Sequence, residues 1–156
     1  GASLEDLYFA PADLYRRVSM FDSALEFCAA DEETFLTLES GYKGDMANAA
    51  AIQPGFSSDA CEVFTLPNSS WARRVSGVYG NELANRAPQK AHAVLTEKPD
   101  GDFLVSVRAP LANKQGADEI CRQFATGGGR SAAAGINALA ADEVDRFIQV
   151  LNDFYR

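Results

Sequence analysis

The sequence predicts an α/β fold, a mixed β-sheet flanked by helices and preceded by a helical N-terminal segment. Apolar residues alternate in several short segments after residue 56, and apolar residues at helical spacing separate those segments. One pair of segments is joined by a tight turn and others by helices, which favours both antiparallel and parallel neighbours. With 156 residues, 47% of them hydrophobic, the chain is long enough to bury a core.

Residues 1–55 are expected to form the helical segment. Ser3 and Asp6 resemble a capping box, and Pro11 suits a first helical turn. An apolar stripe follows at spacings of four and three: Leu14, Val18, Phe21, Leu25 and Cys28. The acidic run 31–33 favours the start of another helix, and a loop around Pro54 ends the segment.

Residues 56–156 are expected to form the sheet domain, with the element order β-α-β-β-α-β-α. Pro99, Asp100 and Gly101 predict the turn of a hairpin. The predicted strands are 61–66, 91–96, 103–108 and 132–136, and the predicted helices lie around 71–83, 117–124 and 144–154.

Several classes of site are excluded by what the sequence lacks. His92 is the only histidine, so multi-histidine metal sites are ruled out, and its place in a strand favours a hydrogen-bonded structural role. Gly127–Arg130 lacks the Lys-Ser/Thr of a Walker A motif, and a loose dinucleotide fingerprint there follows a helix instead of a strand. Three widely spaced cysteines favour buried free thiols over a disulfide framework or a zinc site.

Charge is distributed unevenly along the chain, whose net charge is −8. Residues 1–66 hold twelve acidic side chains against three basic ones, and residues 67–156 hold ten against eleven. The acidic half would repel a long duplex, whereas the arginines of the second half can form a local cationic pocket. Solvated surface ion pairs are the alternative explanation for any one of these arginines.

A run of three glycines, Gly127, Gly128 and Gly129, is the most unusual local feature. Glycines let backbone N–H groups converge on an anion, Arg130 adds a guanidinium suited to phosphate, and Thr126 adds a hydroxyl. A single glycine would suffice to end the preceding helix, which is the structural alternative.

Strand 103–108 supplies a second group of polar side chains. By its period of two, Ser106 and Arg108 lie on one face and Val105 and Val107 on the other. Arg108 is therefore expected to point toward the same pocket as the glycine run, although it could equally pair with a carboxylate.

Taken together, Val105-Ser106-Val107-Arg108 and the run from Gly127 to Gly135 resemble the DHH-associated domain of the DHH phosphoesterase superfamily. That family shows a V-S-x-R strand followed by a G-G-G-H-x-x-A-A-G loop. The resemblance covers about residues 56–156. It implies that Ser106, Arg108 and the three glycines bind substrate, and that Arg130 replaces the usual histidine.

The resemblance also implies what lies outside these residues. Catalysis in the superfamily belongs to an N-terminal domain whose D-x-D and D-H-H motifs hold a metal pair, usually manganese. With a single histidine the sequence has no D-H-H motif, so the chain is expected to be the C-terminal, substrate-binding part of a longer phosphoesterase, with no catalytic residue and no cofactor of its own.

The expected partners are a short phosphorylated ligand (a nucleotide, a short oligonucleotide or polyphosphate) and the N-terminal DHH domain. No membrane partner is expected, because the sequence contains no apolar run long enough for a membrane span, and a cytoplasmic location is the default. The alternative is a structural module that has lost ligand binding and forms a homodimer through its helical N-terminal region.

Overall fold

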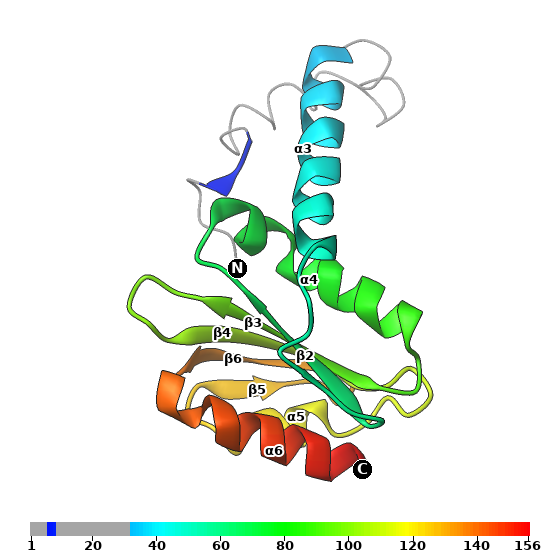
Figure 1. Ribbon diagram of the computed structural model, residues 1–156, viewed down its shortest axis with the longest axis vertical. Coiled ribbons are helices and arrows are strands. Elements are labelled where there is room, and N and C mark those ends of the chain that lie inside the picture. The colour runs from blue at the N-terminus through cyan, green and yellow to red at the C-terminus, as the bar shows by residue number, and fades with distance from the viewer. Residues whose placement is uncertain (1–5, 9–31) are drawn as a thin grey trace.

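In a computed structural model of the chain, residues 6–8 and 32–156 are described (Figure 1). Their centre is a six-stranded sheet of order β1-β2-β3-β4-β6-β5, in which β2 and β3 are parallel and all other neighbours antiparallel. The strands are β1 (Phe56–Ser57), β2 (Cys61–Leu66), β3 (Ala91–Glu97), β4 (Phe103–Arg108), β5 (Gly127–Gly129) and β6 (Ala133–Leu139). The predicted mixed sheet is confirmed.

Helices cover both faces of this sheet. They are α3 (Glu32–Ala50), α4 (Ser70–Arg86), α5 (Ala117–Cys121) and α6 (Val144–Tyr155), with a short 3-10 helix η2 (Ala141–Glu143) before α6. Figure 1 shows α5 and α6 on one side of the sheet and α4 on the other, with α3 projecting away from the sheet beyond α4.

The sequence does not predict the strands β1 and β5. For β5 the reason lies in its composition. The glycine run has no side chains and so gives no alternating pattern, yet Gly127, Gly128 and Gly129 pair with Ile136, Gly135 and Ala134. Arg130 and Ala133 exchange two backbone hydrogen bonds (2.9 and 3.2 Å), which closes a tight hairpin. The predicted loop is therefore an edge strand and a turn, and β6 extends to Leu139.

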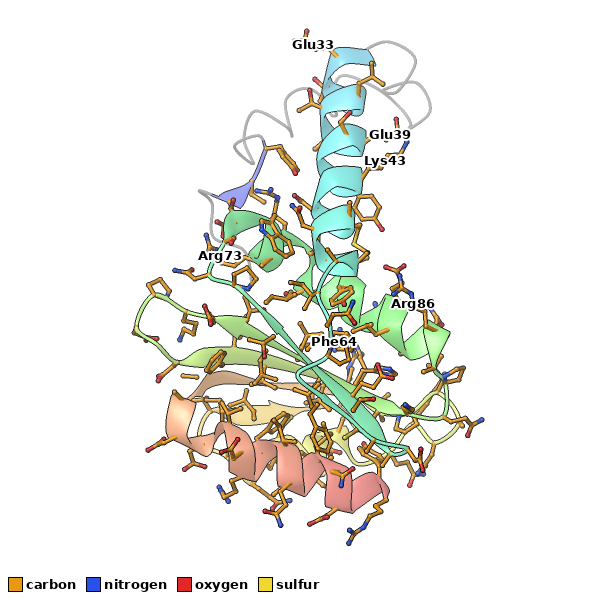
Figure 2. All side chains as sticks on the ribbon, viewed as in Figure 1. Glu33, Glu39, Lys43, Phe64, Arg73 and Arg86 are labelled. Carbon is orange, nitrogen blue, oxygen red and sulfur yellow. The ribbon has the colours of Figure 1, made fainter. Side chains whose placement is uncertain are left out.

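Side chains along β4 point alternately to the two faces of the sheet, and each face borders its own apolar core. Val105 and Val107 are buried with Phe147 and Leu151 of α6 on the face covered by α5 and α6. On the opposite face, Phe64 packs with other apolar side chains between the sheet and α4 (Figure 2). Burying apolar surface on both faces is what holds this layered arrangement together.

Part of the α4 side of the sheet is left uncovered, and we call this surface the open face. Helix α4 packs along β3 and β4, and beyond it the side chains of β4, β6 and β5 are only partly buried or exposed. The open face consists of Leu104, Ser106, Arg108, Gly128, Ala133, Gly135 and Asn137.

The helical segment is described only in part. Helix α3 begins at Glu32, as the acidic run predicts, and it is fixed to α4 by the pair of Asp45 and Arg74 (2.7 Å). The predicted cap at Ser3, the turn at Pro11 and the stripe from Leu14 to Cys28 lie outside the described residues. Within the described residues, no helix has the length and apolarity to cross a membrane.

Candidate functional site

A cavity of about 410 Å³ lies where α4, the end of β4 and the β5–β6 turn meet. Asn81 and Asn85 enter it from one face of α4, Arg108 enters from β4, and Lys114 lies on the loop after β4. Ala84, Ala109, Leu111, Ala132 and Ala133 complete its lining. Small side chains on the hairpin side therefore leave room beside a strongly polar wall.

Arg108 is held in place by neutral groups. Its Nε donates to Oδ1 of Asn81 (2.9 Å), and its Nη1 donates to Oγ of Ser106 (2.9 Å) and to the carbonyl of Val107 (3.3 Å). Within residues 6–8 and 32–156, no carboxylate forms an ion pair with Arg108. The guanidinium is thus oriented by neutral groups, and no carboxylate in the described part of the chain balances its charge.

Arg130 brings a second positive charge to the same end of the open face. It follows β5 directly, is exposed, and its backbone pairs across the hairpin with Ala133, which is the register partner of Arg108. Burial, and then the nearby charge of Arg130, lower the pKa of Arg108. The two cations repel each other, and a bound anion would reduce that repulsion.

The three glycines differ in how much space their surroundings leave for a side chain. A Cβ on Gly127 would lie 1.7 Å from the carbonyl oxygen of Cys121, and one on Gly129 would lie 2.5 Å from Cα of Ala134. Gly129 also has a φ of +143°, which side-chain-bearing residues rarely adopt. Only at Gly128 would a Cβ meet nothing within 4 Å, so of the three this glycine alone faces open space.

Thr126 lies at the other end of β5 from Arg130. Its φ is +63°, and its hydroxyl accepts a hydrogen bond from the backbone N–H of Ala138 (2.9 Å). This bond fixes the entry into the hairpin and gives Thr126 a local structural role.

A histidine and two cysteines are buried in the core. His92 is buried on β3, where burial lowers its pKa, but its Nδ1 has no hydrogen-bond partner in the part of the chain that the structure describes. Cys61 and Cys121 are buried free thiols, as predicted, and burial raises the pKa of Cys121 to about 12.

No metal site is found within the described ranges, where no group of three His, Cys, Asp or Glu side chains is placed to hold an ion.

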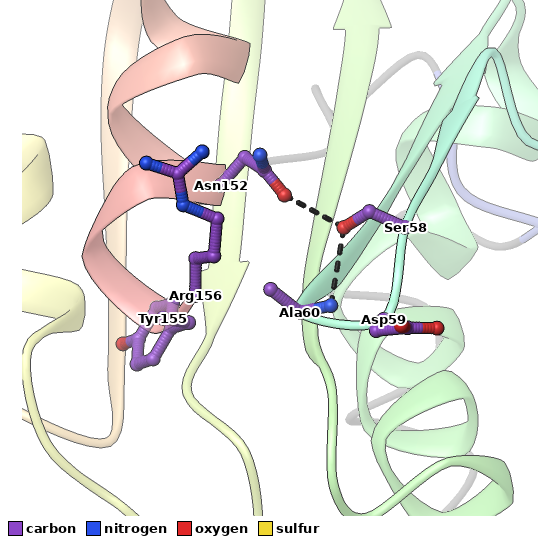
Figure 3. A pocket seen from close by; sticks show the side chains of 6 residues that line it. All are labelled: Ser58, Asp59, Ala60, Asn152, Tyr155 and Arg156. Atoms are coloured by element: carbon purple, nitrogen blue, oxygen red, sulfur yellow. Dashed lines mark hydrogen bonds between the residues drawn. The ribbon is translucent and has the colours of Figure 1, made fainter.

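A smaller cavity of about 320 Å³ lies between the β1–β2 turn and the end of α6 (Figure 3). Ser58 donates to Oδ1 of Asn152 (2.7 Å) and accepts from the backbone N–H of Ala60 (3.1 Å). These bonds join the turn to α6, so Ser58 and Asn152 contribute to the fold.

The sequence does not predict that polar side chains on α4 face Arg108. Asn81 and Asn85 are four residues apart, which places them on one helix face, but a pair of exposed asparagines is ordinary in a surface helix. No pattern in the sequence connects them with β4, because only packing of α4 on the sheet brings them together.

Comparison with protein families places most of the chain in one family. Residues 60–156 match the DHHA1 domain, which is more than half of the chain. The chain belongs to the DHHA1 domain family. A search of curated protein sequences finds no match.

Solved structures share the DHHA1 fold at low sequence identity. A member of a ribosomal protein family, solved as its DHH domain, aligns at TM-score 0.57 and 13% identity, over 97% of this chain and 38% of that one. An exopolyphosphatase-related protein from Bacteroides fragilis gives 0.53 and 16% over 94% and 40%. The pGpG-specific phosphodiesterase PggH from Vibrio cholerae gives 0.50 and 13% over 95% and 46%. The chain spans less than half the length of each.

Proposed function

We propose that this DHHA1 domain binds short phosphorylated ligands on its open face and presents them to a hydrolytic centre carried by another domain. The observation that carries the proposal is Arg108, a half-buried guanidinium held by Asn81 and Ser106, with no carboxylate partner within the described ranges. An oriented cation without a counter-ion suits a phosphate group.

Neighbouring groups support the same ligand chemistry. Arg130 adds a second charge, Lys114 a third, and Gly128 allows close approach of a ligand to the backbone. The similarity in fold to a phosphodiesterase and to an exopolyphosphatase-related protein agrees with a phosphorylated ligand. A cytoplasmic location and dimerisation of the chain stay predictions.

A titration with the 5′-phosphorylated dinucleotide pApA tests the proposal. Loss of one charge-assisted contact costs about 1.5–3 kcal/mol, so Arg108→Gln and Arg130→Gln are each expected to weaken binding about ten- to a hundredfold. Isothermal titration calorimetry on the 156-residue chain gives the affinities.

Arg122→Gln is the matched control, because Arg122 is an exposed arginine on the opposite side of the sheet, paired with Asp118. Thermal unfolding establishes that each variant is folded. Because Arg130 is exposed and Arg108 is half-buried, substitution of Arg130 is expected to disturb the fold less. Equal affinity of the wild type, Arg108→Gln and Arg130→Gln for pApA would contradict the proposal.

A further inference from the structure

The open face carries a second cavity, at the end remote from Arg108. Its volume is about 310 Å³, and Thr96, Lys98, Leu104, Asn137, Asn68 and Arg73 contribute to its lining. Leu104 and Asn137 continue, along β4 and β6, the rows that begin with Ser106 and Gly135. The two cavities therefore lie at opposite ends of one surface, with α4 running beside both.

Thr96 gives this cavity an unused polar group. Its side chain lies between its register partners Leu66 and Leu104, is only 2% exposed, and has a hydroxyl with no hydrogen-bond partner within the described ranges. Buried polar atoms without a partner are rare in folded proteins, because each has lost its hydrogen bonds to water without gaining others. A bound group that hydrogen-bonds to the hydroxyl would replace a lost bond.

A β-bulge forms part of the wall. Phe103 pairs with Leu139 and Val105 with Ile136, so Leu104 alone faces both Asn137 and Ala138. Bulges re-aim side chains and often lie beside binding sites. Here the bulge places the Asn137 amide at the rim of the cavity and Leu104 on its wall.

The arginine at this cavity is paired with a carboxylate, unlike Arg108. Arg73 forms two bonds with the Asp6 carboxylate (both 2.6 Å), and Nζ of Lys98 donates to the backbone carbonyl of Asn137 (3.4 Å). Leu104 and Pro99 supply apolar surface. Neutral amide and hydroxyl groups beside apolar walls suit a planar heterocycle with polar edges better than they suit a phosphate.

Building on the proposed function, we propose that the Thr96 cavity is a subsite for a nucleobase of a ligand whose phosphate is held at Arg108. Leu104 and Arg108 lie four positions apart on β4, which corresponds to about 13 Å. A ligand that fills both ends must be an oligonucleotide of two or more units, since a mononucleotide reaches one end and inorganic polyphosphate has no base.

The test compares pApA, adenosine 5′-monophosphate and inorganic triphosphate by calorimetry. The wild type is expected to bind pApA at least about tenfold more tightly than either other ligand, corresponding to about 1.4 kcal/mol. Thr96→Val, which removes the hydroxyl at nearly constant volume, and Asn137→Ala are each expected to weaken pApA binding about fivefold. Neither variant should change the affinity for the monophosphate or the triphosphate.

Thr65→Val is the control, because Thr65 is exposed on the neighbouring strand β2. Equal affinities for pApA and the monophosphate, or unchanged pApA binding by both Thr96→Val and Asn137→Ala, would overturn the subsite. If Arg108→Gln still weakens binding in that case, the proposed function stands without the subsite. If Arg108→Gln and Arg130→Gln bind pApA like the wild type, the proposed function itself fails.

Discussion

Arg108 illustrates how one side chain is prepared for an anion. The strand turns it to the open face, Ser106 two residues earlier accepts one of its N–H groups, and Asn81 on α4 accepts another. Both acceptors are neutral, so they fix the direction of the guanidinium without cancelling its charge. A carboxylate in place of Asn81 would hold Arg108 equally well but would neutralise the site.

The glycine run is the second residue-scale feature, and it yields a stability prediction. Gly127→Ala and Gly129→Ala are expected to lower the free energy of unfolding by about 2–3 kcal/mol, because each new Cβ would overlap backbone atoms. Gly128→Ala is expected to change it by less than about 0.5 kcal/mol, since its Cβ would enter open space. Urea unfolding followed by circular dichroism measures all three.

An equal loss of stability at the three positions would show that the hairpin, rather than contacts of individual glycines, sets the requirement. If only Gly127→Ala and Gly129→Ala lose stability, Gly128 is the glycine whose missing side chain makes room for a ligand.

At the scale of elements, the attachment of α3 to α4 depends on a nearly buried ion pair. Nε and Nη2 of Arg74 donate to the two carboxylate oxygens of Asp45 (2.7 and 2.9 Å), and the side chains are 18% and 7% exposed. Hydrogen bonds from Arg74 lower the pKa of Asp45. The apolar contacts of Met46 and Ala49 with α4 lie in the same region.

This pair predicts a pH dependence of stability. A carboxyl group whose pKa is lower in the folded state stabilises the fold above its ordinary value of about 3.9, and the contribution is lost as pH falls through the lowered folded value. Asp45→Asn is therefore expected to cost about 3 kcal/mol at pH 7, with a smaller difference from the wild type at pH 3. Urea unfolding at the two pH values gives the comparison.

Glu39→Gln is a suitable control, because Glu39 forms an exposed pair with Lys43 on the same helix. A difference between Asp45→Asn and the wild type that stays constant between pH 7 and pH 3 would mean that packing, not charge, holds α3.

At the scale of the whole molecule, the distribution of charge limits the length of the ligand. The net charge is −8, yet Arg108, Arg130 and Lys114 gather at one end of the open face. A short anion meets these cations alone, whereas a long nucleic acid also meets the acidic remainder of the chain.

Salt dependence makes this limit measurable. Two or three phosphate contacts predict a slope of log K against log salt of about −1.5 to −2 for pApA, from roughly −0.7 per contact on single strands. A 20-nucleotide single strand is expected to bind no more tightly per site than pApA. Fluorescence anisotropy at 50–200 mM salt measures both, and affinity that rises steadily with length would contradict the prediction.

Local patterns along the chain were enough to predict the main elements. Period-two and helical patterns indicated β2, β3, β4, α4 and α6 nearly at their observed bounds, and Pro99-Asp100-Gly101 marked the hairpin. The V-S-x-R strand and the glycine run also pointed to the DHHA1 family. These are short-range signals, since neighbouring residues dictate side-chain direction and turn geometry.

How those elements combine depends on packing between distant segments. Packing made the glycine run an edge strand, placed Asn81 against Arg108, and separated Gly128 from the two glycines that backbone contacts require. It also brought Thr96, Leu104 and Asn137 from three strands to one cavity. Such contacts join residues far apart in the chain, and local propensity carries no information about long-range pairing, which burial of apolar surface and strand register determine.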